Sequence, residues 1–115
     1  MKISFDAIGE KYVTFLAADG AVKGAVCKVS GNDTVDACDE DEVFCGVAAE
    51  IRDGCAAVIL SGYVELPCSD ETTPGAGYAL LAADGEGGVK SVTSGGRSCL
   101  IVHADAAAKT VGLFL

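Results

Sequence analysis

Several residue types that small proteins often depend on are scarce in this sequence. It has no tryptophan, one histidine and two prolines, and its only aromatic residues are four phenylalanines and three tyrosines. Half of the 115 residues are nevertheless hydrophobic, which argues against an intrinsically disordered chain. Much of that fraction is alanine, and each small side chain contributes little burial energy. We therefore expect a modest core that gains stability when a second subunit or a partner covers more of its surface.

Basic residues are scarce as well. Eight Lys and Arg stand against 17 Asp and Glu, so the net charge is −9. Affinity for nucleic acid depends on clustered Lys and Arg, and here the basic residues occur singly along the chain. The composition therefore argues against direct binding of nucleic acid or of an anionic membrane surface. It predicts a solvated acidic exterior.

Long apolar runs are missing too. No stretch approaches the roughly 20 residues that a transmembrane helix needs, and Met1–Asp6 lacks the apolar region of a secretory signal. We expect a soluble protein made in a cytosol, and hence six reduced cysteines in place of a disulfide framework. Four of the cysteines stand within apolar runs, where cysteine behaves as a small hydrophobe: Cys27, Cys45, Cys55 and Cys99.

Glycine residues divide the chain into short segments. Its 15 glycines separate short runs rich in Val, Ile, Leu and Phe, a pattern that predicts an all-β fold: a small β-barrel or sandwich of about nine short strands with hairpins. Asp53-Gly54 between two apolar runs predicts a tight hairpin. The one helical candidate, Asp105–Lys109, is too short to stand alone and predicts a turn. We expect strands near Lys11–Leu16, Val22–Val29, Phe44–Glu50, Cys55–Leu60, Tyr63–Leu66, Tyr78–Ala82, Val89–Val92, Ser98–His103 and Thr110–Leu115.

The apolar runs suggest a weak internal repeat. Phe44–Ala49 followed by Ala57–Leu60 is similar to Ser98–His103 followed by Gly112–Leu115. Each half of this pattern predicts an apolar hairpin. A separate identity, Leu-Ala-Ala-Asp-Gly at 16–20 and at 81–85, has a different offset, so one clean duplication cannot explain both matches.

We divide the chain into an N-terminal arm, residues 1–10, and a single β domain, residues 11–115. The arm carries Lys2 and two apolar residues, Ile3 and Phe5, before a predicted hinge at Gly9. Such an arm can add a strand to an exposed sheet edge of a partner, with the side chains of Lys2, Ile3 and Phe5 as contacts. A frayed terminus is the alternative.

No catalytic, cofactor-binding or metal-binding residues are predicted. His103 closes an apolar strand, and the orienting third group that a Cys–His nucleophile needs is not recognisable, so we expect a half-buried or turn-proximal structural histidine. The closest cysteines, Cys38 and Cys45, are seven positions apart, which is not a zinc spacing.

Two other segments superficially suggest ligand sites. The densest charge, from Asp33 to Glu42, lacks the alternating ligands and central glycine of a calcium loop, and we expect it to be a solvated loop. Gly85–Ser91 suggests a phosphate loop, but Val89 separates the last glycine from Lys90 and a strand should follow. We interpret it as a flexible hairpin loop.

The order of strands and turns resembles a known family. Phe44-Cys45-Gly46-Val47-Ala48, then Asp53-Gly54, then Gly62-Tyr63-Val64-Glu65-Leu66-Pro67, then Gly75-Ala76-Gly77-Tyr78-Ala79-Leu80-Leu81 is similar to the small capsid cement (head decoration) proteins of tailed phages and prophages. Gly62–Pro67 is the closest match. The chain departs from the family pattern at Cys99–Val102, where an Ile-Gly-type turn is favoured, and in its six cysteines.

The resemblance implies a compact, barrel-like β domain that binds the outside of an assembled capsid. Its partner would be the major capsid protein, it would form a homo-oligomer with a trimer favoured, and it would occupy the virion exterior after a period in the host cytoplasm. The leading expectation is thus a structural virion protein and not an enzyme. A small-molecule or carbohydrate-binding β module is the alternative, and an enzyme that uses Cys and His103 is a distant third.

Overall fold

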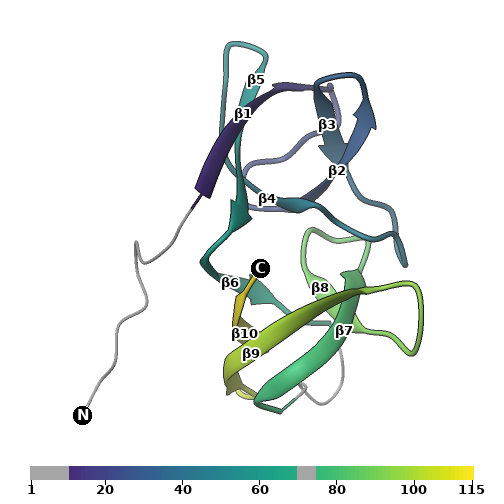
Figure 1. Cartoon of the computed structure of the whole chain (residues 1–115), viewed down its shortest axis with the longest axis vertical. Coiled ribbons are helices and arrows are strands. Elements are labelled where there is room, and N and C mark those ends of the chain that lie inside the picture. The colour runs from purple at the N-terminus through teal and green to yellow at the C-terminus, as the bar shows by residue number, and fades with distance from the viewer. Residues whose placement is uncertain (1–10, 70–74) are drawn as a thin grey trace.

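The computed structural model describes residues 11–69 and 75–115, which form two β units stacked one above the other (Figure 1). The predicted all-β class is confirmed, because the described residues contain ten strands and no helix. The strands are β1 (Lys11–Ala17), β2 (Val26–Gly31), β3 (Thr34–Ala37), β4 (Gly46–Arg52), β5 (Cys55–Ser61), β6 (Tyr63–Pro67), β7 (Gly77–Ala83), β8 (Val89–Ser91), β9 (Arg97–Asp105) and β10 (Thr110–Phe114).

The first five strands close into a barrel in the order β1-β3-β2-β4-β5. Closure depends on a short parallel pairing, in which Leu16 and Ala17 of β1 stand opposite Thr34 and Val35 of β3. The barrel interior is filled by small side chains, namely Cys27, Val35, Ala48, Ala56 and Val58. Small residues allow five strands to close tightly, but they bury little apolar area.

Strand β3 is the one that our sequence analysis missed. Thr34–Ala37 carries a single large apolar residue, Val35, within an acidic stretch, so its pattern predicts a loop. In the structure Val35 is completely buried in the barrel, and β3 pairs with β2 on one side and β1 on the other. Pairing with two neighbours, and not its own composition, makes this segment a strand.

The last five strands form a second sheet in the order β6-β10-β9-β7-β8. All its pairings are antiparallel. A parallel bridge from Cys68 to Val89 brings the end of β6 close to β8, so the sheet curls toward closure. Cys68 is buried there, although its position after Pro67 predicts the first residue of a polar loop. Gly88 allows this approach, since a Cβ at that position would lie 2.4 Å from the Pro67 carbonyl oxygen.

The largest core lies between the barrel and the sheet. Phe44 and Val47 from the barrel side pack in one cluster with Leu66, Leu81 and Ile101 from the sheet. The chain's C-terminal residue, Leu115, packs against the same cluster, and Figure 1 shows the C-terminus between the two units. The two units therefore bury their large side chains against each other.

Most predicted turns are confirmed. Asp53 and Gly54 both have positive φ, 53° and 76°, in the tight turn of the β4–β5 hairpin. In the turn after β9, the Asp105 carboxylate accepts hydrogen bonds from the backbone N–H groups of Ala107 and Ala108. Asp19-Gly20 also lies in a turn, within the connection from β1 to β2, and these two strands are not neighbours in the barrel.

Candidate functional site

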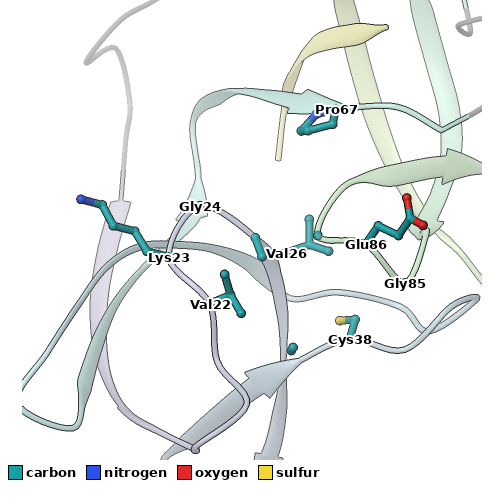
Figure 2. A pocket seen from close by; sticks show the side chains of 11 residues that line it. Val22, Lys23, Gly24, Val26, Cys38, Pro67, Gly85 and Glu86 are labelled. Carbon is teal, nitrogen blue, oxygen red and sulfur yellow. The ribbon is translucent and has the colours of Figure 1, made fainter.

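A pocket of about 330 Å³ lies where the barrel meets the sheet. Its walls come from the segment leading into β2, the end of β3, the end of β6 and the β7–β8 loop (Figure 2). The volume lies near the lower end of the range for small-molecule sites. The lining residues are Val22, Lys23, Gly24, Ala25, Val26, Ala37, Cys38, Pro67, Gly85, Glu86 and Gly87.

The chemistry of this pocket is mostly apolar. The charged ends of Lys23 and Glu86 lie on opposite sides and point away from each other (Figure 2), and the Lys23 ammonium is 3.3 Å from the Glu50 carboxylate. Burial raises the pKa of the Cys38 thiol to about 11, so the group is protonated near neutral pH. Such a pocket can enclose a small apolar group, but its lining side chains offer no nucleophile–base pair.

The β7–β8 loop is a hairpin loop, as the sequence predicts, and β8 follows it. The Asp84 carboxylate accepts hydrogen bonds from the backbone N–H groups of Glu86 at 2.7 Å and Gly88 at 3.1 Å. In a phosphate loop such N–H groups would face the ligand. Here the protein's own carboxylate already occupies them.

His103 does not meet a cysteine. It is exposed near the end of β9, close to the turn at Asp105, so the turn-proximal expectation is confirmed and the half-buried alternative is wrong. Cys99 on the same strand is buried. The β9–β10 register shifts between Ile101 and His103, which breaks the alternation that would otherwise place Cys99 and His103 on one face. The described residues also contain no group of three or more His, Cys, Asp or Glu side chains arranged to hold a metal ion.

The expectation of a solvated acidic loop holds for only part of this segment. Thr34–Ala37 forms a strand, whereas residues 39–41 lie outside any strand and are exposed. The Lys90 ammonium from β8 lies 2.8 Å from the Glu40 carboxylate and 2.6 Å from that of Asp41. The backbone N–H of Asp41 donates to the carbonyl of Ala83, and the N–H of Ala83 donates to the carbonyl of Glu42. We call residues 39–42 the acidic strap, because they tie the barrel to the sheet.

Lysine neighbours account for the electrostatics of the acidic strap. The Glu42 carboxylate lies 2.7 Å from the Lys28 ammonium. This hydrogen bond, together with one from the Asp39 N–H, holds the pKa of Glu42 below its usual value. The Asp41 and Glu40 carboxylates correspondingly raise the pKa of Lys90. Lys28 and Lys90 therefore neutralise part of the strap's charge, which comes from four carboxylates.

Arg97 is a structural residue that the sequence analysis missed. At the start of β9, its guanidinium donates to the carbonyl of Cys45 at 2.7 Å and to that of Leu60 at 3.3 Å. The same group lies 5.8 Å from the centre of the Phe44 ring. Arg97 thus clamps the sheet to the barrel. An isolated arginine after two glycines carries no sequence signal for this role.

All six cysteines are free thiols in the structure, and burial divides them. Cys27 and Cys99 are buried, as the small-hydrophobe interpretation predicts, whereas Cys45 and Cys55 are only partly buried. Cys38 and Cys68 are also buried, although they lie outside the apolar runs.

The outer face of the sheet carries a row of large apolar side chains. Tyr63 on β6 stands opposite Phe114 on β10, Phe114 opposite Leu100 on β9, and Leu100 opposite Tyr78 on β7. Directly opposed residues share one face of a sheet. The rings of Tyr63 and Phe114 pack edge to face with centroids 5.6 Å apart, and Tyr78 is 79% exposed. We call these four residues the apolar row.

Residues 1–10, and with them Lys2, Ile3 and Phe5 of the predicted arm, lie outside the described residues. Within the described part, no helix is long and apolar enough to cross a membrane. No protein-family model and no curated protein sequence matches this chain. Its function must accordingly be argued from its own residues.

Proposed function

We propose that this protein is a structural virion protein that decorates the head of a tailed phage or prophage. It binds the outside of the assembled capsid, contacts the major capsid protein and bridges neighbouring capsid subunits. It acts without a cofactor and performs no catalysis. Before assembly it resides in the host cytoplasm, and it works as a homo-oligomer, with a trimer favoured.

The apolar row is the observation that carries this proposal. Apolar patches on protein surfaces commonly mark interaction sites, and three of the seven aromatic residues gather in this one row. Within the row Tyr78 is exposed, and the other three side chains are partly buried. Strand β6, where the row begins, is also the segment in which the sequence most resembles head decoration proteins. A row that spans four strands suits a broad protein surface better than a small ligand.

Charge supports the same partner class. Four of the eight basic side chains, those of Lys23, Lys28, Lys90 and Arg97, are engaged within the described fold, which leaves the −9 surface without a cationic cluster among the described residues. An acidic exterior disfavours contact with packaged DNA and is compatible with the outer surface of a capsid.

Co-sedimentation with capsids of the element that encodes the protein tests the proposal. The intact protein should pellet with assembled capsids at low salt, and Tyr78→Ala should reduce binding by tenfold or more, since aromatic anchors dominate interface energetics. Tyr12→Ala is the matched control, because Tyr12 is an exposed tyrosine on β1 of the barrel. If the intact protein stays in the supernatant, the decoration function is wrong.

A deletion of residues 2–6 tests the predicted arm. We expect weaker capsid binding with a melting temperature nearly equal to that of the intact protein. A deletion that unfolds the domain would instead identify the arm as a core strand. Light scattering at high micromolar concentration tests the homo-oligomer, and a monomer there would contradict oligomerisation in free solution.

The pocket favours a second candidate, a small-molecule-binding β module. Its apolar walls suit a compact apolar ligand, and 8-anilinonaphthalene-1-sulfonate is a suitable probe. Under this candidate, the probe should fluoresce with the native protein and lose its signal in Ala25→Phe, which places a ring at the pocket wall. Equal fluorescence from both proteins would remove the pocket as the binding site.

A further inference from the structure

Two cysteines meet where β2 joins the start of β4. Cys27 on β2 is opposite Gly46 in the strand register, and the backbone N–H of Cys45 donates to the carbonyl of Cys27 at 2.8 Å. Both side chains belong to the barrel cluster, with Cys27 fully buried and Cys45 packed against it from the partly exposed side. The Cys27 thiol donates to the Gly46 carbonyl at 3.6 Å and is also close enough to interact with the Cys45 thiol. The pair is thus a preformed dithiol.

Cys45 is the member that solvent can reach. It lines a cavity of about 400 Å³ on the barrel surface together with Val43, Phe44 and the paired side chains of Lys28 and Glu42. The Arg97 guanidinium is anchored on the carbonyl of Cys45 itself. Cys45 therefore lines a cavity large enough for a small oxidant, whereas Cys27 is buried in the barrel core.

The electrostatics favour a thiolate at the exposed position. The hydrogen bond from the Cys27 thiol lowers the pKa of Cys45 to about 7, and the Arg97 charge contributes to the shift. Cys45 is therefore more readily ionised near neutral pH than an ordinary thiol, whose pKa is 9.0. The same hydrogen bond and burial raise the pKa of Cys27, which keeps it the proton donor. The two thiols therefore differ in pKa: Cys45 is the more easily ionised, and Cys27 stays protonated.

We propose that Cys45 and Cys27 form a peroxide-reactive dithiol, in which Cys45 is oxidised first and Cys27 then closes an intramolecular disulfide. The Cys45 thiolate attacks one oxygen of a hydroperoxide, so that an S–O bond forms and the O–O bond breaks. The second oxygen leaves as an alkoxide or hydroxide and takes up a proton. Cys45 becomes a sulfenic acid, oxidised by two electrons, while the peroxide is reduced to an alcohol or water.

The second step joins the two sulfurs. Cys27 attacks the Cys45 sulfur, an S–S bond forms and the S–O bond breaks. Hydroxide leaves and accepts the Cys27 proton as water. One hydroperoxide is consumed, and no other reductant or oxidant is needed. Because β2 and the start of β4 are already adjacent, the product links two neighbouring segments of the barrel.

Mass spectrometry after treatment with hydrogen peroxide tests this site. The intact protein should lose about 2 Da, and its thiols under denaturing conditions should fall from six to four. Trypsin cleaves after Lys23, Lys28 and Arg52, so peptide 24–28 should be linked to peptide 29–52. The latter also contains Cys38, and the linked pair must therefore persist in the Cys38→Ala variant. Its disappearance there, or a link between two chains, would overturn the proposal.

Labelling rates separate the two cysteines that solvent reaches. Cys55 is partly buried, as Cys45 is, but its recorded strand partners are Leu16 and Arg52, not a second cysteine. Iodoacetamide at pH 7 should label Cys45 about tenfold faster than Cys55 in the native protein. Cys45→Ser should abolish disulfide formation, whereas Cys55→Ser should leave it unchanged. Equal labelling rates in the intact protein, which need no variant to fold, would contradict a reactive Cys45.

Discussion

The barrel and the sheet differ in the size of the side chains that they bury. The barrel closes around small side chains, with Val35 and Val58 the largest among its fully buried residues. The sheet instead contributes leucines and isoleucine to the cluster that it shares with the outside of the barrel. Closing the barrel and stabilising it therefore depend on different contacts. Closure pairs the backbone N–H and C=O groups of the five strands, whereas the large buried side chains lie in the core that the barrel shares with the sheet.

The segments that resemble each other in sequence illustrate this difference. Hairpins β4–β5 and β9–β10 confirm the predicted pair of apolar hairpins, and each contains one register shift. In the first hairpin the inward side is lined by alanine and valine, and in the second it presents Cys99, Ile101 and Leu113 to the shared core. Two hairpins of similar sequence and pairing thus occur in different surroundings, one in the closed barrel and one in the second sheet.

Truncation of Phe44 should have the largest effect on this arrangement. Phe44→Ala removes the bulkiest buried side chain from the shared core and should lower the free energy of unfolding by about 4 kcal/mol, as seen by urea denaturation. Val35→Ala, inside the barrel, should cost roughly 2 kcal/mol, since fewer methyl groups are lost. If Val35→Ala costs as much as Phe44→Ala, the barrel does not depend on the sheet in the way we describe.

Adding one methyl group at Gly46, the first residue of β4, should have the next largest effect on stability. A Cβ at Gly46 would lie 2.2 Å from the Ile59 carbonyl oxygen, a backbone atom that cannot move aside. Gly46→Ala should therefore destabilise the protein by roughly 1–3 kcal/mol. Gly31→Ala is the control, because a Cβ there meets no atom within 4 Å. Equal melting temperatures for the two variants would show that β4 and β5 are not tightly packed at Gly46.

Weakening the hydrogen bonds of Arg97 should lower the stability by a smaller amount. Arg97→Lys keeps the charge but cannot donate to both the Cys45 and Leu60 carbonyls in the same geometry, and we expect a loss of about 1–2 kcal/mol. Arg52→Lys is the matched control and should be neutral, because Arg52 is exposed at the end of β4. Hydrogen exchange should increase at the interface of barrel and sheet in Arg97→Lys. Exchange confined to the turn before β9 would contradict a clamp.

The smallest effect concerns pH and the acidic strap. Because the pKa of Glu42 is lower in the folded protein than the usual 4.5, its contribution is present above that value and is lost as the pH falls through the lower folded value. Glu42→Gln should consequently be slightly less stable than the intact protein at pH 7, and the difference should shrink as the pH falls below 4.5. Thermal melts at low salt measure it. A difference that stays constant as the pH falls would exclude ionisation as its cause.

Most strands could be predicted because each carries its own pattern. Nine of the ten strands among the described residues overlap a range that its own sequence predicts, and the Asp53-Gly54 turn needs only two residues that tolerate positive φ. The features that could not be predicted are contacts between residues far apart in the chain. Arg97 and Lys90 appear in the sequence as isolated basic residues, and their partners Cys45 and Glu40 lie 52 and 50 positions away.

The sequence by itself determined the all-β class, the turns and the shortage of bulky side chains, since these follow from local composition and from the backbone preferences of single residues. Tertiary structure alone decided that Thr34–Ala37 becomes a strand and that the acidic strap pairs with lysines. It also decided that Cys27 meets Cys45 and that four apolar residues align across β6, β10, β9 and β7. The physical reason is that pairing between distant segments sets which side chains meet, and no local period encodes that pairing.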